Sequence, residues 1–147
     1  MTSSDEGSYL SVKEFLELVI RFERDAAQFY RDLREKLERE EVRQLIAILE
    51  DEEIRHEKVL RDFMQTGDVE GFIQFPPEIE LSMPDVPDSD TGVDELIDIA
   101  IERERRAFLM YENAATVTAG SFKGLLEGLA AFEKEHEIKL KSFKSYY

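Results

Sequence analysis

The chain contains 147 residues, of which 42% are hydrophobic, and its 34 Asp and Glu outnumber its 19 Lys and Arg to give a net charge of −15. Such a length fits one domain with a continuous hydrophobic core. The negative charge argues against nucleic acid and anionic membranes as partners, because phosphate groups are bound by clustered Lys and Arg. Because the chain has no Cys, it cannot build a disulfide, a thiolate zinc site, an iron–sulfur cluster or a rubredoxin centre.

Two further features bear on where the protein works. No apolar run in the sequence approaches the roughly 20 residues that span a bilayer. Residues 1–6 lack the basic and apolar regions of a signal peptide. We therefore expect a cytoplasmic protein, folded as a single domain over residues 1–147.

The first half of the chain predicts a helical hairpin over residues 11–65. Apolar residues recur there at three- and four-residue steps, which is the period of an amphipathic helix. The first helix is expected over residues 11–37, where Ser11 and Glu14 form the sequence pattern of a capping box. The second helix is expected over residues 40–65.

Residues 66–91 are predicted to form a long connection. Every proline of the chain lies in it, and proline breaks helices because it lacks a backbone donor. No segment of the chain alternates polar and apolar residues as a strand does, so we expect an all-α protein. The prolines are Pro76, Pro77, Pro84 and Pro87.

The second half predicts another hairpin, over residues 92–144. One helix is expected over residues 93–117 with Thr91 as its cap, and the last over residues 121–144. In this last region glycine recurs at every fourth residue, at Gly120, Gly124 and Gly128. Since glycine inside a helix costs about 1 kcal/mol relative to alanine, we expect this face to meet another backbone closely, either in a neighbouring helix or in a second subunit.

The two hairpins repeat each other. Glu104 lies 81 residues after Glu23, and Tyr111 lies 81 residues after Tyr30. The second helices of the hairpins repeat in the same way, with an offset of 80 residues. A duplicated hairpin is the simplest explanation, and four helices of this length with two short turns predict a four-helix bundle.

The long connection has a physical reason in such a bundle. If a two-fold axis perpendicular to the bundle relates the hairpins, the second and third helices run in the same direction. The chain must then travel the whole bundle between them, and a helix of about 25 residues is roughly 38 Å long. About 26 residues of extended chain reach about twice that distance, so we expect a crossover at residues 66–91.

Four glutamates occupy positions where the helical stripes predict apolar residues. Each follows one apolar residue by four positions and precedes another, or a tyrosine, by seven, so each shares the inward face of its helix. Each also lies within about one turn of the middle of its helix, and the two histidines of the chain lie one turn beyond two of them. The six residues are Glu23, Glu53, His56, Glu104, Glu133 and His136.

Charge decides what this cluster requires. Burying even one unpaired carboxylate is costly, and four facing one another cost more. No Lys or Arg is expected on the inward stripes to compensate. Two divalent cations would cancel four carboxylates, and imidazole with carboxylate suits iron, manganese or zinc. We therefore predict a buried dinuclear metal site, although either Glu-x-x-His motif alone is weak evidence and more often marks an exposed helix face.

Other candidate residues allow more than one interpretation. Tyr30 and Tyr111 fit either ordinary core tyrosines or donors of hydrogen bonds to the glutamate ligands. The acidic stretches at residues 38–41 and 50–52 are expected to face solvent.

Together these residues resemble the ferritin-like superfamily and, within it, the rubrerythrin-related proteins. The resemblance covers both hairpins and implies a ferritin-like bundle with a non-haem di-iron site that reacts with O₂ or hydrogen peroxide. It further implies that Glu53 and Glu133 bridge the metals and that the other four residues are terminal ligands. The motifs that carry the resemblance are Glu23 with Phe29-Tyr30, Glu53-Ile54-Arg55-His56, Glu104 with Tyr111, and Glu133-Lys134-Glu135-His136.

Two departures from rubrerythrins are visible. Rubrerythrins typically carry an extra glutamate one turn after the ligand of the third helix, where this chain has Ala107, with Ala26 as its repeat mate. The site therefore looks like the six-ligand arrangement of ferritin and bacterioferritin. The rubredoxin domain is absent as well, so electrons would come from an external donor such as a rubredoxin.

The function that we expect is a di-iron oxidoreductase that reduces hydrogen peroxide or O₂ with two iron ions, for which manganese or zinc could substitute. A homo-oligomer is expected, with a dimer favoured. One alternative is a ferroxidase that handles iron. An alternative from a different class is a metal-free helical scaffold, whose acidic surface and crossover residues 72–75 bind another protein.

Overall fold

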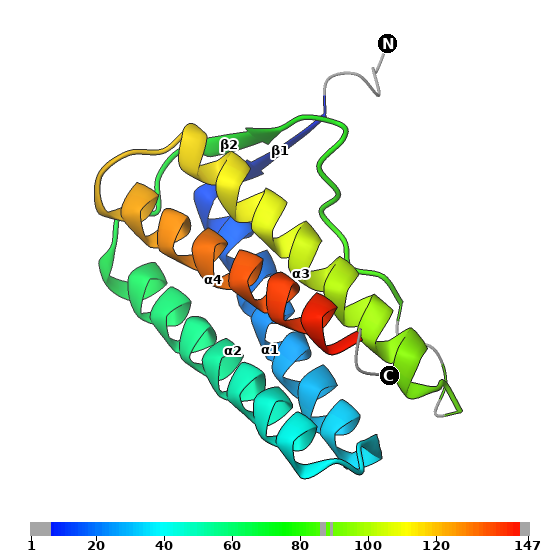
Figure 1. Ribbon diagram of the computed structural model, residues 1–147. Helices are drawn as coiled ribbons and strands as arrows, with labels where there is room; N and C mark the ends of the chain where they lie inside the picture. The colour runs from blue at the N-terminus through cyan, green and yellow to red at the C-terminus, as the bar shows by residue number, and fades with distance from the viewer. Residues whose placement is uncertain (1–6, 86–87, 89, 145–147) are drawn as a thin grey trace.

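The computed structural model describes residues 7–85, 88 and 90–144, and in them it shows a bundle of four helices with a two-stranded sheet at one end (Figure 1). The predicted all-α four-helix bundle is confirmed. Residues 1–6 and Pro87, which entered the sequence predictions, lie outside the described residues. The elements are β1 (Ser8–Ser11), α1 (Val12–Lys36), α2 (Glu40–Thr66), β2 (Phe72–Phe75), α3 (Val93–Thr116) and α4 (Gly120–Lys144).

The helix starts follow local chemistry. The capping box at the start of α1 is present, because the Ser11 hydroxyl accepts a hydrogen bond from the Glu14 amide and the Glu14 carboxylate accepts one from the Ser11 amide. The prediction for α3 is wrong, because its N-cap is Gly92, with no side-chain cap. The Thr91 amide instead donates to the carbonyl of Asp88 within a turn.

The expectation that the chain has no strand is also wrong. β1 and β2 pair in antiparallel fashion, with Ser8 opposite Phe75 and Ser11 opposite Phe72. Ile73 and Phe75 are fully buried, and the Phe75 ring packs 5.5 Å from that of Phe15 at the start of α1. Four residues are too few for a clear alternating pattern, and the strand forms because this pairing closes one end of the core.

The crossover runs the length of the bundle, as expected. α2 and α3 point in the same direction, and the chain between them first pairs as β2 and then descends beside α3 (Figure 1). Arg106 on α3 fixes this segment by donating to the carbonyl of Ser82 at 3.0 Å and by pairing with Glu80 at 3.1 Å.

Two apolar clusters make up the core, one at each end of the bundle. The cluster next to the sheet contains Phe15 and Leu126 among others, and the cluster at the opposite end contains Leu33 and Ile46. On every helix, the predicted glutamate ligand falls in the interval between the residues that join one cluster and those that join the other. A polar layer therefore divides the core at mid-height.

The glycine face of α4 does not meet a neighbouring helix among the described residues, and contact with a second subunit stays a prediction. A Cβ atom added to Gly124 or Gly128 would meet nothing within 4 Å, so no backbone of the described chain lies against them. Gly120 has a φ of +65° at the first residue of α4, a backbone conformation that glycine adopts readily. None of the described helices is both long enough and apolar enough to span a bilayer.

Candidate metal centre

The structure brings all six predicted ligands together in the polar layer. Each helix contributes one glutamate, and the four glutamates are only 1–2% exposed. Both histidines are buried as well, and their rings stack with centroids 6.1 Å apart. The glutamates are inward because each shares a helix face with buried apolar neighbours, so helix packing alone carries the carboxylates into the core.

The six residues form two overlapping groups, each able to hold one metal ion. One group joins Glu23 and His56, and the other joins Glu104 and His136. Glu53 and Glu133 belong to both groups. Within each group the ligand atoms lie within 4.8 Å of one another. This is the geometry of two cation positions that share two carboxylates.

Both imidazoles turn Nδ1 toward the carboxylates. Nδ1 of His56 lies 3.2 Å from Glu53, 3.3 Å from Glu133 and 3.6 Å from Glu23. Nδ1 of His136 lies 2.9 Å from Glu104 and 3.6 Å from Glu53. In each histidine the same ring nitrogen therefore faces the shared carboxylates.

Two tyrosines hold the outer oxygens of the glutamates. The Tyr30 hydroxyl donates to Glu104 at 3.0 Å, and the Tyr111 hydroxyl donates to Glu23 at 2.6 Å. Both tyrosines are about 1% exposed. Of the two interpretations that the sequence left open, the structure shows the hydrogen-bonding one, with each tyrosine contacting the glutamate of the other hairpin.

Unpartnered polar atoms test whether the residues fit a metal. Both carboxylate oxygens of Glu53, one oxygen of Glu133 and Nδ1 of His56 are buried and form no hydrogen bond. Leaving such atoms unpaired in a core is costly. All four atoms belong to the two overlapping groups, so bound cations would satisfy them; among the described residues, the other buried side-chain atoms without a hydrogen bond belong to Glu50, Glu137 and Arg103, outside these groups. The residues present fit a dinuclear metal site.

Without a metal the cluster retains protons. Burial, with the neighbouring charges of Glu133 and Glu23, raises the pKa of Glu53 well above its usual range. Burial, with Glu104 and Glu23 nearby, raises the pKa of Glu133 to about 8. The carboxylates cannot all ionise at neutral pH unless positive charge is supplied.

The pKa values of the two histidines are also raised, but by neighbouring carboxylates and against the effect of burial. Burial lowers the pKa of His56, but contacts with Glu133 and Glu23 outweigh burial and raise that pKa to about 10. Burial is likewise outweighed at His136, whose pKa Glu104 raises to about 9. The metal-free cluster therefore uses imidazolium as its cation, and metal ions would have to displace those protons.

Residues that the sequence reasoning missed surround the cluster. Glu52, expected to face solvent, accepts a 3.0 Å hydrogen bond from Nε2 of His136. Glu50, also expected outside, is buried and paired with Arg31 and Arg34. Helix periodicity predicts which residues lie at the centre of the inward face of a helix. Glu50 and Glu52 lie at the edge of that face, where the length of the side chain decides whether it is buried.

Arg103 corrects the expectation that no basic residue faces inward. It is 8% exposed, its guanidinium lies 5.5 Å from the centre of the Phe29 ring, and its Nε has no hydrogen-bond partner among the described residues. No ion pair within 4 Å joins it to the four glutamates in the described part of the chain. The sequence does contain a signal for this position. Arg103 corresponds in the repeat to Phe22, and an apolar residue at the equivalent position indicates that the position faces inward.

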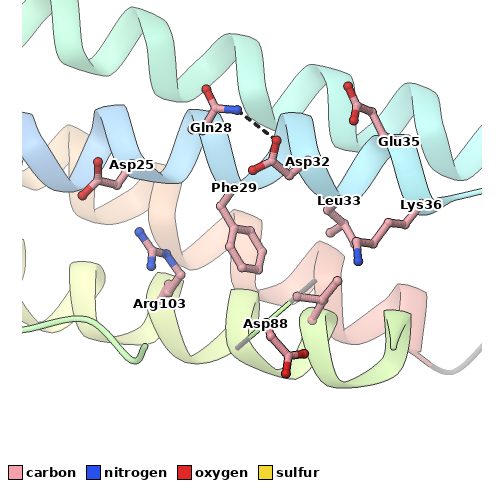
Figure 2. Close-up of a pocket in the computed structure, with 10 residues that line it drawn as sticks. Asp25, Gln28, Phe29, Asp32, Leu33, Glu35, Lys36, Asp88 and Arg103 are labelled. Carbon is pink, nitrogen blue, oxygen red and sulfur yellow. Dashed lines mark hydrogen bonds between the residues drawn. The ribbon is translucent and has the colours of Figure 1, made fainter. Parts of the chain in front are cut away.

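Two cavities lie near the site. A cavity of about 10 Å³, the size of one water molecule, lies against the glutamates and is lined by Ala26, Ala107 and Met83 of the crossover. A larger groove of about 580 Å³ lies between α1 and α3, and none of the six predicted ligands lines it (Figure 2). Arg103 lines both cavities, and in Figure 2 its guanidinium points along α1 toward Asp25.

Two solved structures are similar to this chain in fold. A Thermotoga maritima structure, described as a ferritin-like diiron-carboxylate protein, is 24% identical with a TM-score of 0.79 and covers 93% of this chain and 96% of its own. A hypothetical protein from Pyrococcus furiosus is 26% identical with a TM-score of 0.75, covering 92% of this chain and 89% of its own. No curated protein matches the chain.

The likeness to the Thermotoga maritima structure shows that the chain has the fold of a ferritin-like bundle. The model of the family called Rubrerythrin matches residues 14–144, which include both hairpins and the whole polar layer. This chain therefore belongs to the rubrerythrin family.

Proposed function

We propose that this protein is a non-haem di-iron oxidoreductase that reduces hydrogen peroxide or O₂ at the buried cluster. The observation that carries the proposal is the set of unpartnered carboxylate and imidazole atoms shared between two four-residue groups. Glu53 and Glu133 would bridge the ions, Glu23 and His56 would complete one position, and the remaining two residues the other. A pair of ferrous ions supplies two electrons, one from each ion, to an oxidant.

The protein's own residues organise the remaining chemistry. Tyr111 and Tyr30 hold the terminal glutamates in place through their hydroxyl groups. The apolar clusters above and below exclude water, which strengthens charge interactions at the site. Converting hydrogen peroxide to two waters takes two electrons and two protons. Burial and the neighbouring carboxylates raise the pKa of Tyr30 and of Tyr111, so these hydroxyls keep their protons and serve as hydrogen-bond donors to the ligands.

The size of the inner cavity supports a small oxidant. Ala26 and Ala107 leave about 10 Å³ beside the glutamates, which is room for one water-sized group, so a two-atom oxidant would enter only if side chains move. Met83 covers this cavity from the crossover, and Arg106 fixes the crossover there. A large organic substrate has no comparable space next to the ligands.

Regeneration of the ferrous state requires electrons from outside the chain, because it has no Cys and so no rubredoxin centre. We propose an external donor protein such as a rubredoxin. A homo-oligomer, with a dimer favoured, is part of the same proposal.

A ferroxidase is the second candidate, and a specific observation supports it. Ala107 stands where rubrerythrins typically carry an additional glutamate, so the ligand set resembles the six-residue arrangement of ferritins. Of the crossover residues named in the scaffold alternative, Ile73 and Phe75 are buried inside the protein, so only the exposed part of the segment, which includes the 75% exposed Phe72, could contact a partner.

Anaerobic ferrous loading followed by separate challenges with hydrogen peroxide and O₂ tests the function. A peroxidase oxidises its iron with peroxide much faster than with O₂, consuming one peroxide per two iron ions. A ferroxidase reacts rapidly with O₂ and continues to oxidise added iron. Iron that binds but reacts slowly with both oxidants would contradict the proposed activity.

A further inference from the structure

The repeat that builds the cluster is broken at the pair of equivalent positions beside the two histidines. Glu52 and Phe132 lie 80 residues apart, each immediately before a shared glutamate. Glu52 extends from α2 to His136 on α4, where its Oε1 lies 3.0 Å from Nε2. Phe132 extends from α4 to His56 on α2, with ring centroids 5.1 Å apart and an angle of 62° between the rings. The two histidines therefore have chemically different outer neighbours.

This difference bears directly on metal binding. An imidazole that binds a metal through Nδ1 must carry its proton on Nε2, and an acceptor at Nε2 fixes that tautomer and the ring orientation. The Glu52 carboxylate provides this acceptor for His136. Among the described residues none accepts a hydrogen bond from Nε2 of His56, whose ring is held by an aromatic edge instead.

We propose that Glu52 is a positioning residue that makes the two metal positions unequal, so that the position of Glu104 and His136 binds a divalent cation more tightly than that of Glu23 and His56. This inference rests on the proposed metal site. Partners that orient a ligating histidine typically change metal affinity about 10- to 100-fold. The Glu52 side chain is 19% exposed, so it also adds a negative charge that is only partly screened.

One nearby charge acts in the opposite sense. Arg103 precedes Glu104 on α3, and its positive charge disfavours a cation on that side. It forms no ion pair within 4 Å with the cluster in the described chain, whereas Glu52 contacts His136 directly. Since the interaction between charges falls with distance, the direct contact dominates.

Cobalt titration of the metal-free protein tests the inference, because the visible absorption of Co²⁺ reports each position as it fills. We expect two steps, with affinities at least about tenfold apart. Glu52→Ala should weaken the tighter step by about 10- to 100-fold and leave the weaker one unchanged. Glu52→Gln, which keeps an acceptor but loses the charge, should fall between. Asp51→Ala is the control, since Asp51 is exposed and pairs only at 3.7 Å with Arg55 among the described residues.

Single variants assign the steps to positions. His136→Ala should abolish the tighter step and His56→Ala the weaker one, while Phe132→Glu should strengthen the weaker step. Thermal unfolding of the metal-free variants tests whether Glu52 has only a structural role. In that case Glu52→Ala would lower the Tm of the metal-free protein and weaken both binding steps together. Two equal steps in the wild type, or equal weakening of both by Glu52→Ala, would overturn the inference while leaving the metal site intact. Failure of the wild type to bind any cobalt would overturn the proposed function as well.

Discussion

Tyr111 on α3 donates a 2.6 Å hydrogen bond to Glu23 on α1, so a residue of one hairpin holds a predicted ligand of the other. The reciprocal bond runs from Tyr30 on α1 to Glu104 on α3. This exchange couples the site to the packing of the hairpins, because neither terminal glutamate is fully held unless both hairpins are in place.

Removing one of these hydroxyls should weaken both folding and metal binding. Tyr111→Phe leaves a buried oxygen of Glu23 without its donor, which should lower the free energy of unfolding of the metal-free protein by about 1–3 kcal/mol. Metal affinity should fall by about tenfold or more. Urea unfolding and metal titration measure the two effects. Tyr9→Phe is the control, because Tyr9 is largely exposed, and unchanged metal affinity in Tyr111→Phe would contradict this role.

Truncating a predicted ligand should lower metal occupancy. Glu53→Ala removes a carboxylate shared by both positions, and His136→Ala removes the single imidazole of one position. Elemental analysis of the purified variants measures the loss. Glu57→Ala is the matched control on α2, because Glu57 pairs with Arg61 and Arg24 outside the cluster. Equal occupancy in all three variants would show that the cluster does not hold the metal.

The stability of the metal-free protein should fall as the pH rises. The folded protein raises the pKa of Glu133 from 4.5 to about 8, that of His56 from 6.5 to about 10 and that of His136 from 6.5 to about 9. A group with a raised pKa binds more protons when folded, so its stabilising contribution is complete below its unfolded pKa and is lost as the pH passes its folded pKa.

The test is thermal unfolding of the protein kept free of metal by a chelator, at about pH 6 and about pH 9. The lower Tm is expected at the higher pH. Metal binding displaces these protons, so cation affinity should rise over the same interval. A chelated protein that gains stability between the two pH values would show that the cluster is not protonated.

The buried strand of the crossover should contribute strongly to stability. Phe75 is fully buried against Phe15, so Phe75→Ala should lower the free energy of unfolding by about 3–5 kcal/mol. Phe72, three residues earlier in β2, is 75% exposed, and Phe72→Ala should change the free energy of unfolding by less than about 0.5 kcal/mol. Equal effects of the two substitutions in urea unfolding would contradict the observed packing of β2.

Much of the fold is readable from the sequence because helix periodicity and the repeat are strong signals. The boundaries of α1 and α2 agree with the prediction to within about one residue. β2 could not be predicted in this way, because a four-residue strand is decided by its partner, β1, and by the core that it covers. The cap of α3 was misplaced by one residue, because the helix begins at Val93 and so leaves Gly92, not Thr91, at the capping position.

The same distinction applies to the site: features set by local spacing could be predicted from the sequence, and contacts between distant segments could not. Inward positions such as Glu23 and Glu133 follow from their spacing, since a helix face is a local property. The contacts of Glu52 with His136 and of Arg103 with Phe29 depend on how helices from different parts of the chain pack together. Both residues do stand opposite apolar mates in the repeat, Phe132 and Phe22, and such mismatches are the sequence signal that marks them.

The central claim is that six buried side chains hold two metal ions. Iron analysis of the full chain after anaerobic ferrous loading and removal of unbound metal tests it most directly. The structure predicts about two iron ions per chain, because two four-residue groups share two carboxylates. A well-folded chain that retains no iron, with the same Tm before and after loading, would contradict the claim.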